Sequence, residues 1–363
     1  MSAAIATSEF NPAKAEAFAA RFLTTLNNGA LCLMASVGHR TGLFDVMSKG
    51  LPGTSQEIAL SAGLNERYVR EWLGAMFTAG VVEYDQATSR FSLLAEHAAI
   101  LTRAAAADNM AVFAQYIAVL GAVEDDIVAC FKNGGGVPYE RFPRFHEVMA
   151  EDSGQSVMST LESHILPLVG GLTDRLARGI RVLDAGCGRG RVLNRLAELF
   201  PRSSFVGMDL STTAVSSATE EAKSKRLGNV EFVSVDLSAF DETAEPEAFD
   251  FITTFDAIHD QAKPLNVLQG IHRALKPDGV YLMQDISGTG HVHEDVAHPI
   301  GTFLYTVSCM HCMTVSLAQG GEGLGAMWGE VKTREYLARA GFRSVETHRL
   351  AHDIQNNWYV VRK

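Results

Sequence analysis

The feature that most constrains the fold is the stretch Arg181-Val-Leu-Asp-Ala-Gly-Cys-Gly-Arg-Gly190. The apolar run from Ile180 to Leu183 predicts a buried strand, and the apolar periodicity from Val192 to Phe200 predicts a helix. The glycines between them form a turn that lacks side chains, so a ligand can lie close to the backbone. Because open α/β sheets bind ligands beyond the carboxyl ends of their strands, we expect a ligand site at this turn.

The spacing of the glycines discriminates between two kinds of ligand. The dinucleotide fingerprint is G-x-G-x-x-G, but its third glycine position is occupied by Arg191. The pattern here is G-x-G-x-G at Gly186, Gly188 and Gly190, preceded by Asp184. It resembles motif I of the class I S-adenosylmethionine (SAM) methyltransferases. The resemblance implies a turn that SAM approaches closely, with an acidic neighbour suited to its ammonium group.

The composition narrows the class of protein. A chain of 363 residues is long enough for two domains, and its net charge of −11 argues against nucleic acid or an anionic membrane as partner. The scattered spacing of the five cysteines favours reduced thiols over a disulfide framework. No apolar run approaches the roughly 18 residues that span a bilayer, and the N-terminus lacks the features of a signal peptide. We therefore expect a cytoplasmic protein that binds neither nucleic acid nor membrane.

The first part of the chain has the pattern of a winged helix. Thr54 and Glu57 have the spacing of a capping box, and the turn 62–65 separates two short helices. The expected elements are helices over 12–28, 30–37, 54–62 and 66–79, and a hairpin over 80–84 and 90–93. We predict a helical and winged-helix domain over 1–103, a helical linker or lid over 104–175, and a catalytic domain over 176–363.

From residue 180 onward, strand and helix patterns alternate as a parallel α/β sheet requires. The predicted strands are 180–184, 204–208, 230–235, 250–255, 279–285, 343–349 and 357–361. The last two are close in sequence and are predicted to pair antiparallel. The predicted fold class is α/β, with the Rossmann-like seven-stranded sheet of SAM methyltransferases preceded by a mostly helical winged-helix domain.

Three acidic residues follow three predicted strands at the expected cofactor site. Asp184 closes the first strand, Asp209 closes the second and can accept hydrogen bonds from ribose hydroxyls, and Asp236 closes the third. The resemblance places the adenine amino group near Asp236. Each aspartate has an alternative structural role as a helix N-cap. The predicted SAM-binding residues are Asp184, Gly186, Gly188, Gly190, Asp209, Leu210, Asp236, Leu237 and Phe255.

His259 follows the fourth main strand and is the candidate general base. Small-molecule O-methyltransferases with an N-terminal winged helix carry a His-Asp pair at this place, and His259-Asp260 resembles it. The resemblance implies transfer of a methyl group from SAM to an oxygen, releasing S-adenosylhomocysteine. This chain has Gln261 where that family usually has Trp, and the alternative is that His259 caps or packs the next helix or shapes the pocket.

The substrate is predicted to be a small, partly apolar molecule held by aromatic side chains with polar tips. The predicted substrate-binding residues are Tyr116, Tyr139, Phe145, Asp260, Tyr305, His311 and Trp328. The histidines at 291, 293 and 298 and the stretch Cys309-Met-His-Cys312 lack the spacing of a known zinc motif, so no metal is predicted. Because Thr302–Leu317 is mostly apolar, His311 and the cysteines are expected on a helix that lines a pocket.

The winged helix has two possible roles, in DNA binding or in dimerisation. Over residues 54–85 there are two basic and five acidic side chains, a net charge of −3, which disfavours contact with phosphates. The resemblance to O-methyltransferases implies instead a homodimer formed through this domain. Methylation of sulfur or nitrogen in a small metabolite, or a SAM-responsive transcription regulator, are the alternative functions.

Overall fold

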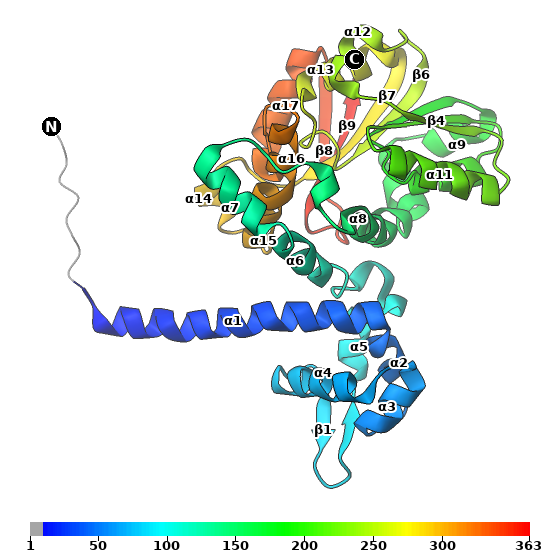
Figure 1. Cartoon of the computed structure of the whole chain (residues 1–363). Coiled ribbons are helices and arrows are strands. Elements are labelled where there is room, and N and C mark those ends of the chain that lie inside the picture. Colours follow the sequence, from blue (N-terminus) through cyan, green and yellow to red (C-terminus); the bar gives the residue numbers. More distant parts are fainter. Residues whose placement is uncertain (1–9) are drawn as a thin grey trace. The chain divides into compact units, whose positions relative to one another are not determined.

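The computed structural model describes residues 10–363, which form two compact units (Figure 1). The first extends to Ala118 and the second covers Val119–Lys363. Residues 1–9, with which the first predicted domain begins, lie outside the described residues. In residues 10–363, no helix has the length and apolar character needed to cross a membrane.

The first unit begins with a single long helix, not with the two helices predicted over 12–28 and 30–37. Helix α1 (Pro12–Thr41) continues through Gly29, because one glycine inside a helix costs only about 1 kcal/mol. It ends at Gly42, whose φ of 74° is left-handed and stops the helix. The other elements are α2 (Leu43–Lys49), α3 (Ser55–Ala62), α4 (Glu66–Thr78), β1 (Glu83–Asp85), β2 (Arg90–Ser92), α5 (Ala95–Leu101) and the 3₁₀ turn η1 (Arg103–Asp108).

The predicted winged helix is present in this unit. Thr54 and Glu57 form the capping box, with Thr54 Oγ1 accepting from Glu57 N at 3.3 Å and Glu57 Oε2 accepting from Thr54 N at 2.8 Å. Strands β1 and β2 pair antiparallel as the wing. The core is centred on Trp72, which donates a hydrogen bond to Met34 O at 2.8 Å. A Cβ at Gly38 would lie 2.5 Å from the Trp72 ring, so α1 approaches α4 closely at this glycine.

The second unit contains the predicted seven-stranded sheet. Its strand order is β5-β4-β3-β6-β7-β9-β8, and β9 is antiparallel to both of its neighbours. The predicted antiparallel pairing of the last two strands is therefore confirmed. The strands are β3 (Arg181–Ala185), β4 (Ser204–Asp209), β5 (Val230–Ser234), β6 (Phe249–Phe255), β7 (Leu275–Ile286), β8 (Ser344–His348) and β9 (Asn356–Arg362).

Helices cover both faces of this sheet, as parallel strands require (Figure 1). One face packs against α9 (Leu172–Arg178), α10 (Arg191–Leu199) and α11 (Thr212–Ser224). The other packs against η6 (Leu237–Ala239), α12 (Phe240–Thr243), α13 (Pro264–Ala274) and α17 (Gly329–Ala340). The carboxyl ends of β3, β4, β5, β6 and β7 therefore lie along one edge.

Two segments add to this edge of the sheet. Of the predicted lid segment, α6 (Ala114–Gly121) crosses the boundary between the two units, and the second unit contains α7 (Glu124–Asn133), η2 (Tyr139–Arg141), α8 (Phe145–Ser153), η3 (Gly154–Met158), η4 (Leu161–Ile165) and η5 (Leu166–Leu168). The insertion after β7 contains α14 (Val292–Asp295), α15 (Gly301–Val307), the π-helical turn η7 (Ser308–Cys312), α16 (Met313–Ala318) and η8 (Ala326–Trp328). The backbone N–H of Val137 donates to Thr314 Oγ1 at 2.8 Å, which joins the two segments.

Candidate active site

The glycine turn connects β3 to α10 and requires all three of its glycines. Gly186, Gly188 and Gly190 have φ angles of 81°, 52° and 64°, which L side chains rarely adopt. A Cβ at Gly186 would lie 2.5 Å from Ala257 Cβ, and one at Gly190 would lie 2.3 Å from the Phe232 ring. A Cβ at Gly188, in contrast, would have no atom of residues 10–363 within 4 Å apart from its own chain neighbours. Gly188 is therefore the position of the turn that a ligand can approach.

Asp209 joins the glycine turn to the end of β4. Its Oδ2 accepts from Gly188 N at 2.8 Å, and its Oδ1 accepts from Ser211 N at 2.8 Å. Each carboxylate oxygen keeps a second lone pair, so Asp209 can still accept from ribose hydroxyls. The structure thus places Asp209 beside the open glycine.

Asp184 is buried at the end of β3, where Thr253 Oγ1 donates to its Oδ1 at 2.9 Å. Burial raises the pKa of Asp184 to about 7, while the Thr253 hydrogen bond partly offsets this rise. A buried carboxyl with such a pKa is suited to a cationic neighbour, because the neighbour would favour its ionised form.

The other predicted cofactor residues lie at the same edge of the sheet. Asp236 is exposed and caps η6, accepting from Ser238 N at 2.8 Å. Leu237 packs into the core below this edge, whereas Leu210 is exposed and Phe255 lies half-buried against Trp358. The helix-capping role therefore applies to Asp236, and contact of these residues with SAM stays a prediction.

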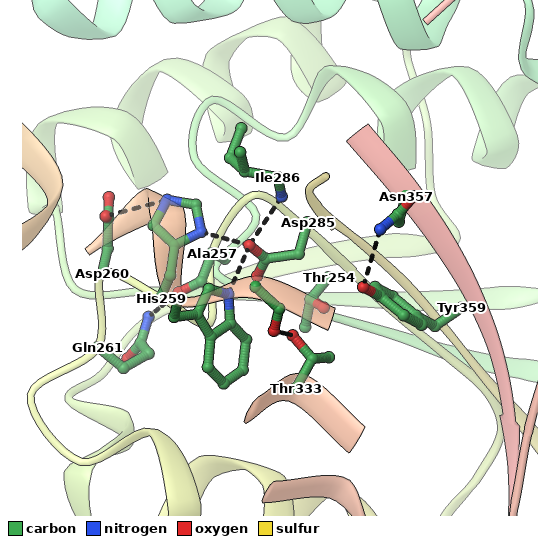
Figure 2. A network of polar contacts seen from close by, with 12 residues as sticks. Thr254, Ala257, His259, Asp260, Gln261, Asp285, Ile286, Thr333, Asn357 and Tyr359 are labelled. Atoms are coloured by element: carbon green, nitrogen blue, oxygen red, sulfur yellow. Dashed lines mark hydrogen bonds and ion pairs between the residues drawn. The ribbon is translucent and has the colours of Figure 1, made fainter. Parts of the chain in front are cut away.

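His259 lies in the loop that follows β6, between two carboxylates (Figure 2). Its Nδ1 is 2.7 Å from Asp285 Oδ1, and its Nε2 is 3.3 Å from Asp260 Oδ1. Because the Asp285 carboxylate only accepts, Nδ1 of the neutral ring carries the proton and Nε2 carries the lone pair. The same loop packs against the glycine turn, since Ala257 is the residue that a Cβ at Gly186 would strike.

Asp285, at the carboxyl end of β7, is the functional residue that the sequence analysis missed. Its Oδ1 accepts from Trp328 Nε1 at 3.0 Å and from Ile286 N at 2.8 Å, in addition to facing His259. Its side chain is fully buried. The available signal was an acidic residue ending a predicted strand, the same signal that identified Asp184 and Asp209.

The electrostatics of the pair favour a charged histidine. Burial by itself lowers the pKa of His259, but the carboxylates of Asp285 and Asp260 outweigh burial and hold that pKa well above its usual value. Burial raises the pKa of Asp260, and the charge of His259 partly opposes the rise. An imidazolium formed by proton capture at His259 would therefore be stabilised in place.

Cys312 lies next to His259 and Asp260, although it is distant from them in the sequence. One atom of each side chain lies within 4.8 Å of the other two. Burial, and then the Asp260 carboxylate, raises the pKa of Cys312 to about 12, so the group is a thiol. In residues 10–363, the sets of His, Cys, Asp and Glu close enough to share a metal ion all include His259.

Aromatic side chains cover this cluster. His311 is fully buried and stacks on Phe145 with ring centroids 3.4 Å apart, while Tyr139 and Phe142 contact it edge-on. Tyr139 also donates to Asp260 Oδ2 at 3.1 Å. Burial lowers the pKa of His311 well below its usual value, so its ring is neutral. The structure thus brings Tyr139, Phe145, Asp260 and His311 together.

The remaining predicted substrate residues are placed differently. Trp328 is buried, and its indole N–H is committed to Asp285, so its observed role is to position that carboxylate. Tyr305 donates to Asp295 Oδ2 at 2.8 Å within the insertion. Tyr116 lies in the first unit. Substrate contact by these three residues stays a prediction.

Comparison with known proteins identifies two domains. Residues 29–103 match the family described as the Rv2258c-like winged HTH domain, and residues 176–333 match the family described as the methyltransferase domain. A ubiquinone biosynthesis O-methyltransferase of Paracidovorax citrulli is 32% identical over 117 residues, which are 32% of this chain and 48% of that protein. The chain spans about half the length of the curated relatives it matches.

Solved structures share the fold over nearly the whole chain. A putative O-methyltransferase from Nostoc punctiforme has a TM-score of 0.71 at 19% identity, covering 95% of this chain and 98% of its own. The mitomycin 7-O-methyltransferase MmcR has a TM-score of 0.67 at 19% identity, covering 97% and 100%. Human N-acetylserotonin methyltransferase, solved in complex with SAM, has a TM-score of 0.61 at 16% identity, covering 98% and 99%.

The fold and the matched families define the class of protein. A segment that matches the methyltransferase domain family follows a segment that matches a winged helix-turn-helix family, and solved methyltransferases share the fold. This is the two-domain architecture that the sequence predicted from the glycine turn and the helix-turn-helix pattern.

Proposed function

We propose that this protein transfers the methyl group of SAM to an oxygen atom of a small molecule, with His259 as general base. The observation that carries the proposal is the buried Asp285–His259 pair, with 2.7 Å between Oδ1 and Nδ1, in a loop that packs against the glycine turn. This arrangement supports the proposal, because a proton acceptor at His259 would lie near the expected position of the methyl donor.

The cofactor would be held by residues at the carboxyl edge of the sheet. Gly188 leaves room for close approach, Asp209 offers lone pairs to the ribose hydroxyls, and Asp184 would favour the positively charged ammonium group of SAM. SAM supplies an electrophilic methyl group on its sulfonium. The protein's own contribution is to align the acceptor in line with that group and to exclude water.

His259 would remove the proton of the acceptor hydroxyl as the methyl group is transferred. Asp285 holds the ring through Nδ1, so Nε2 is the basic atom, and it would stabilise the imidazolium that forms. Trp328 and Ile286 N hold Asp285 in turn. A base positioned in this way typically contributes ~10²–10⁴-fold to the rate.

A small acceptor is favoured by the cover over His259. Phe145, Tyr139 and Phe142 pack around His311, and Tyr139 also donates to Asp260 beside His259, so the cover contains several flat aromatic side chains. Such surfaces suit a planar, partly apolar acceptor such as a phenol.

The winged helix is proposed to join two copies of the chain, not to bind DNA. In helix α4, Arg70 pairs with Glu66 at 3.2 Å and Arg67 pairs with Glu71, so both arginines are committed to glutamates. Four apolar side chains on α1 are instead 52–64% exposed, namely Phe18, Phe22, Leu23 and Leu26. An exposed apolar face of this kind marks an interaction surface.

The proposal is tested by calorimetry with SAM, followed by detection of S-adenosylhomocysteine with a panel of phenols, thiophenols and aromatic amines. We expect SAM to bind and the phenols to be the preferred acceptors. A preference for thiols or amines would support the alternative acceptor atoms. Absence of SAM binding by folded protein would contradict the function as a whole.

A further inference from the structure

We propose that His259, Asp260 and Cys312 form a site for one soft divalent cation such as Zn²⁺, and that the bound ion inhibits methyl transfer by occupying His259 Nε2. The binding part of the proposal stands on the geometry of the cluster alone. The inhibition part rests on the proposed function, because it assumes that His259 removes a proton.

The three donor atoms have the spacing of ligands around one ion. Bond lengths of 2.0–2.3 Å in a tetrahedral zinc site place neighbouring ligand atoms about 3.3–3.8 Å apart. His259 Nε2 and Asp260 Oδ1 are 3.3 Å apart, and the three donor atoms of His259, Asp260 and Cys312 all lie within 4.8 Å of one another. Only small side-chain adjustments are needed to place one ion between them.

The chemistry of the donors selects the kind of cation. A thiol sulfur, an imidazole nitrogen and a carboxylate oxygen form a set that suits zinc, whereas magnesium and calcium prefer oxygen ligands. The other close set, Asp256, His259 and Asp285, is less suitable, because His259 Nδ1 and Asp285 Oδ1 already face each other at 2.7 Å. The cluster with Cys312 is therefore the favoured site.

A second observation points to a missing ligand at this place. Both ring nitrogens of His311 are buried and have no hydrogen-bond partner within residues 10–363, and Asp260 Oδ1 has no contact of this kind beyond its 3.3 Å ion pair with His259 Nε2. His311 Nδ1 lies 4.0 Å from Asp260 Oδ2, so the ring is directed at the cluster. Leaving buried polar atoms without a partner is costly, and a cation would satisfy Asp260 directly and bring His311 within reach as a fourth ligand.

The surrounding residues orient the donors as in known zinc sites. A histidine that binds zinc usually donates its other ring N–H to a carboxylate, and Asp285 accepts that bond here. Tyr139 holds the other oxygen of Asp260 at 3.1 Å. When the ion binds, the S–H proton of Cys312 and the Nε2 proton of the imidazolium leave to solvent, and the thiolate and the Nε2 lone pair coordinate the metal.

The binding experiment titrates full-length protein with ZnCl₂ by calorimetry and compares two cysteine variants. We expect one ion per chain, at least tenfold weaker binding in Cys312→Ser, and binding within about twofold of wild type in Cys309→Ser. Cys309 is the matched control, because it lies on the same turn, is half-buried and is not part of the cluster. MgCl₂ should not bind at the same concentrations.

Two further measurements test the proposal independently, in case Cys312→Ser fails to fold. Wild-type protein loaded with CoCl₂ should show thiolate-to-cobalt charge-transfer absorption, and Asp260→Asn should weaken zinc binding at least tenfold. No stoichiometric zinc binding, a cobalt spectrum without a thiolate ligand, or equal affinities in the two cysteine variants would overturn the proposal.

The experiment on inhibition measures methyl transfer to the acceptor molecule that the panel assay identifies. We expect zinc at its binding concentration to reduce turnover at least tenfold and EDTA to restore it, and we expect the zinc concentration that halves turnover to rise at least tenfold in Cys312→Ser, measured against that variant's own zinc-free turnover. If zinc binds but turnover is unaffected, the inhibition part is wrong. Because calorimetry needs no acceptor, failure of the proposed function would not alter the binding result.

Discussion

At the scale of single residues, the site depends on buried polar groups that hold one another. His259 and Trp328 both contact Asp285 Oδ1, which also accepts from the backbone N–H of Ile286 (Figure 2). Buried networks of this kind are stable only when they are well satisfied. A change in one member is therefore expected to affect the chemistry more than the fold.

The first prediction concerns this network. His259→Gln and Asp285→Asn are each expected to lower kcat at least tenfold, because the first removes the base and the second removes the negative charge that stabilises the imidazolium. The affinity for SAM should stay within about twofold. Steady-state kinetics and calorimetry check both statements. Turnover equal to wild type in both variants would exclude the general-base role.

Trp328→Phe provides a matched comparison for these variants. It removes the hydrogen bond to Asp285 Oδ1 but keeps an aromatic ring in the core. We expect a smaller loss of kcat than in Asp285→Asn, since His259 Nδ1 and Ile286 N still hold the carboxylate. A larger loss would show that the indole contacts substrate, as the sequence analysis predicted.

The second prediction concerns Asp184 and pH. Its pKa is raised by burial to about 7, so the folded protein keeps a proton that the unfolded chain loses near pH 4. Asp184 therefore contributes stability at low pH, and this contribution is lost as pH rises to about 7, at up to about 1.4 kcal/mol per pH unit. Asp184→Asn does not titrate and should gain stability relative to wild type over that range.

Thermal unfolding of both proteins between pH 5 and 8, without SAM, measures this difference. As pH rises, the melting temperature of Asp184→Asn should increase relative to that of the wild type. Above about pH 7 the difference between the two melting temperatures should become constant. Melting temperatures that change in parallel would mean that Asp184 ionises normally. Added SAM should reduce the advantage of the variant, because its ammonium group favours the ionised carboxyl.

At the scale of structural elements, the glycines of the turn have two different roles: some allow close packing and one leaves space for a ligand. Gly186 and Gly190 are in contact with Ala257 and Phe232, so these two glycines let neighbouring elements approach each other. Gly188 has open space beside it and donates its N–H to Asp209. The three glycines of one motif therefore serve different purposes.

The third prediction follows from this difference. Gly188→Ala should cost roughly 1–2 kcal/mol of stability from its left-handed φ alone, yet weaken SAM binding at least tenfold, because the new methyl group fills the open space. Gly190→Ala should unfold at a clearly lower temperature. Gly228→Ala, at an open position with ordinary φ, is the control. Unchanged SAM affinity in Gly188→Ala would place the cofactor elsewhere.

The π-helical turn η7 is a second element with a specific consequence. It carries His311 and Cys312 as consecutive buried residues that reach the loop after β6. Turns of this kind are rare and occur often at functional sites. The short segment thereby supplies both the aromatic cover and the thiol of the proposed cation site.

At the scale of the whole molecule, the long helix α1 has apolar side chains that the rest of its own unit leaves exposed. Every residue from 12 to 30 is exposed, although Phe18, Phe22 and Leu26 recur at helical spacing. Tertiary packing normally provides most of the stability of a helix, so a partner is expected along this part of α1.

The fourth prediction is that the protein is a dimer and that this face is part of the interface. The double variant Phe22→Glu and Leu26→Glu should shift the mass measured by light scattering after gel filtration from two chains to one. Lys14→Glu, on the same helix, is the control for added negative charge. A monomeric wild-type protein at micromolar concentration would contradict the prediction.

Much of the fold was predictable because it is encoded in local patterns. The seven strands and the glycine turn follow from runs of apolar residues and from glycine spacing, and the capping box follows from Thr54 and Glu57. Helix α1 was divided wrongly, because the composition around Gly29 resembles a helix end although the helix continues to Thr41. Local signals cannot decide whether a glycine is tolerated inside a helix.

The sequence by itself determined the α/β class, the acidic residues at strand ends and the position of His259, because each depends on neighbours within a few residues. Only the tertiary structure decided that Asp285 is the partner of His259 and that Cys312 lies beside Asp260. These residues belong to separate segments, and they meet because β6 and β7 are adjacent parallel strands and the insertion after β7 folds back over their ends. Contacts of that kind depend on strand order and register, which no local pattern encodes.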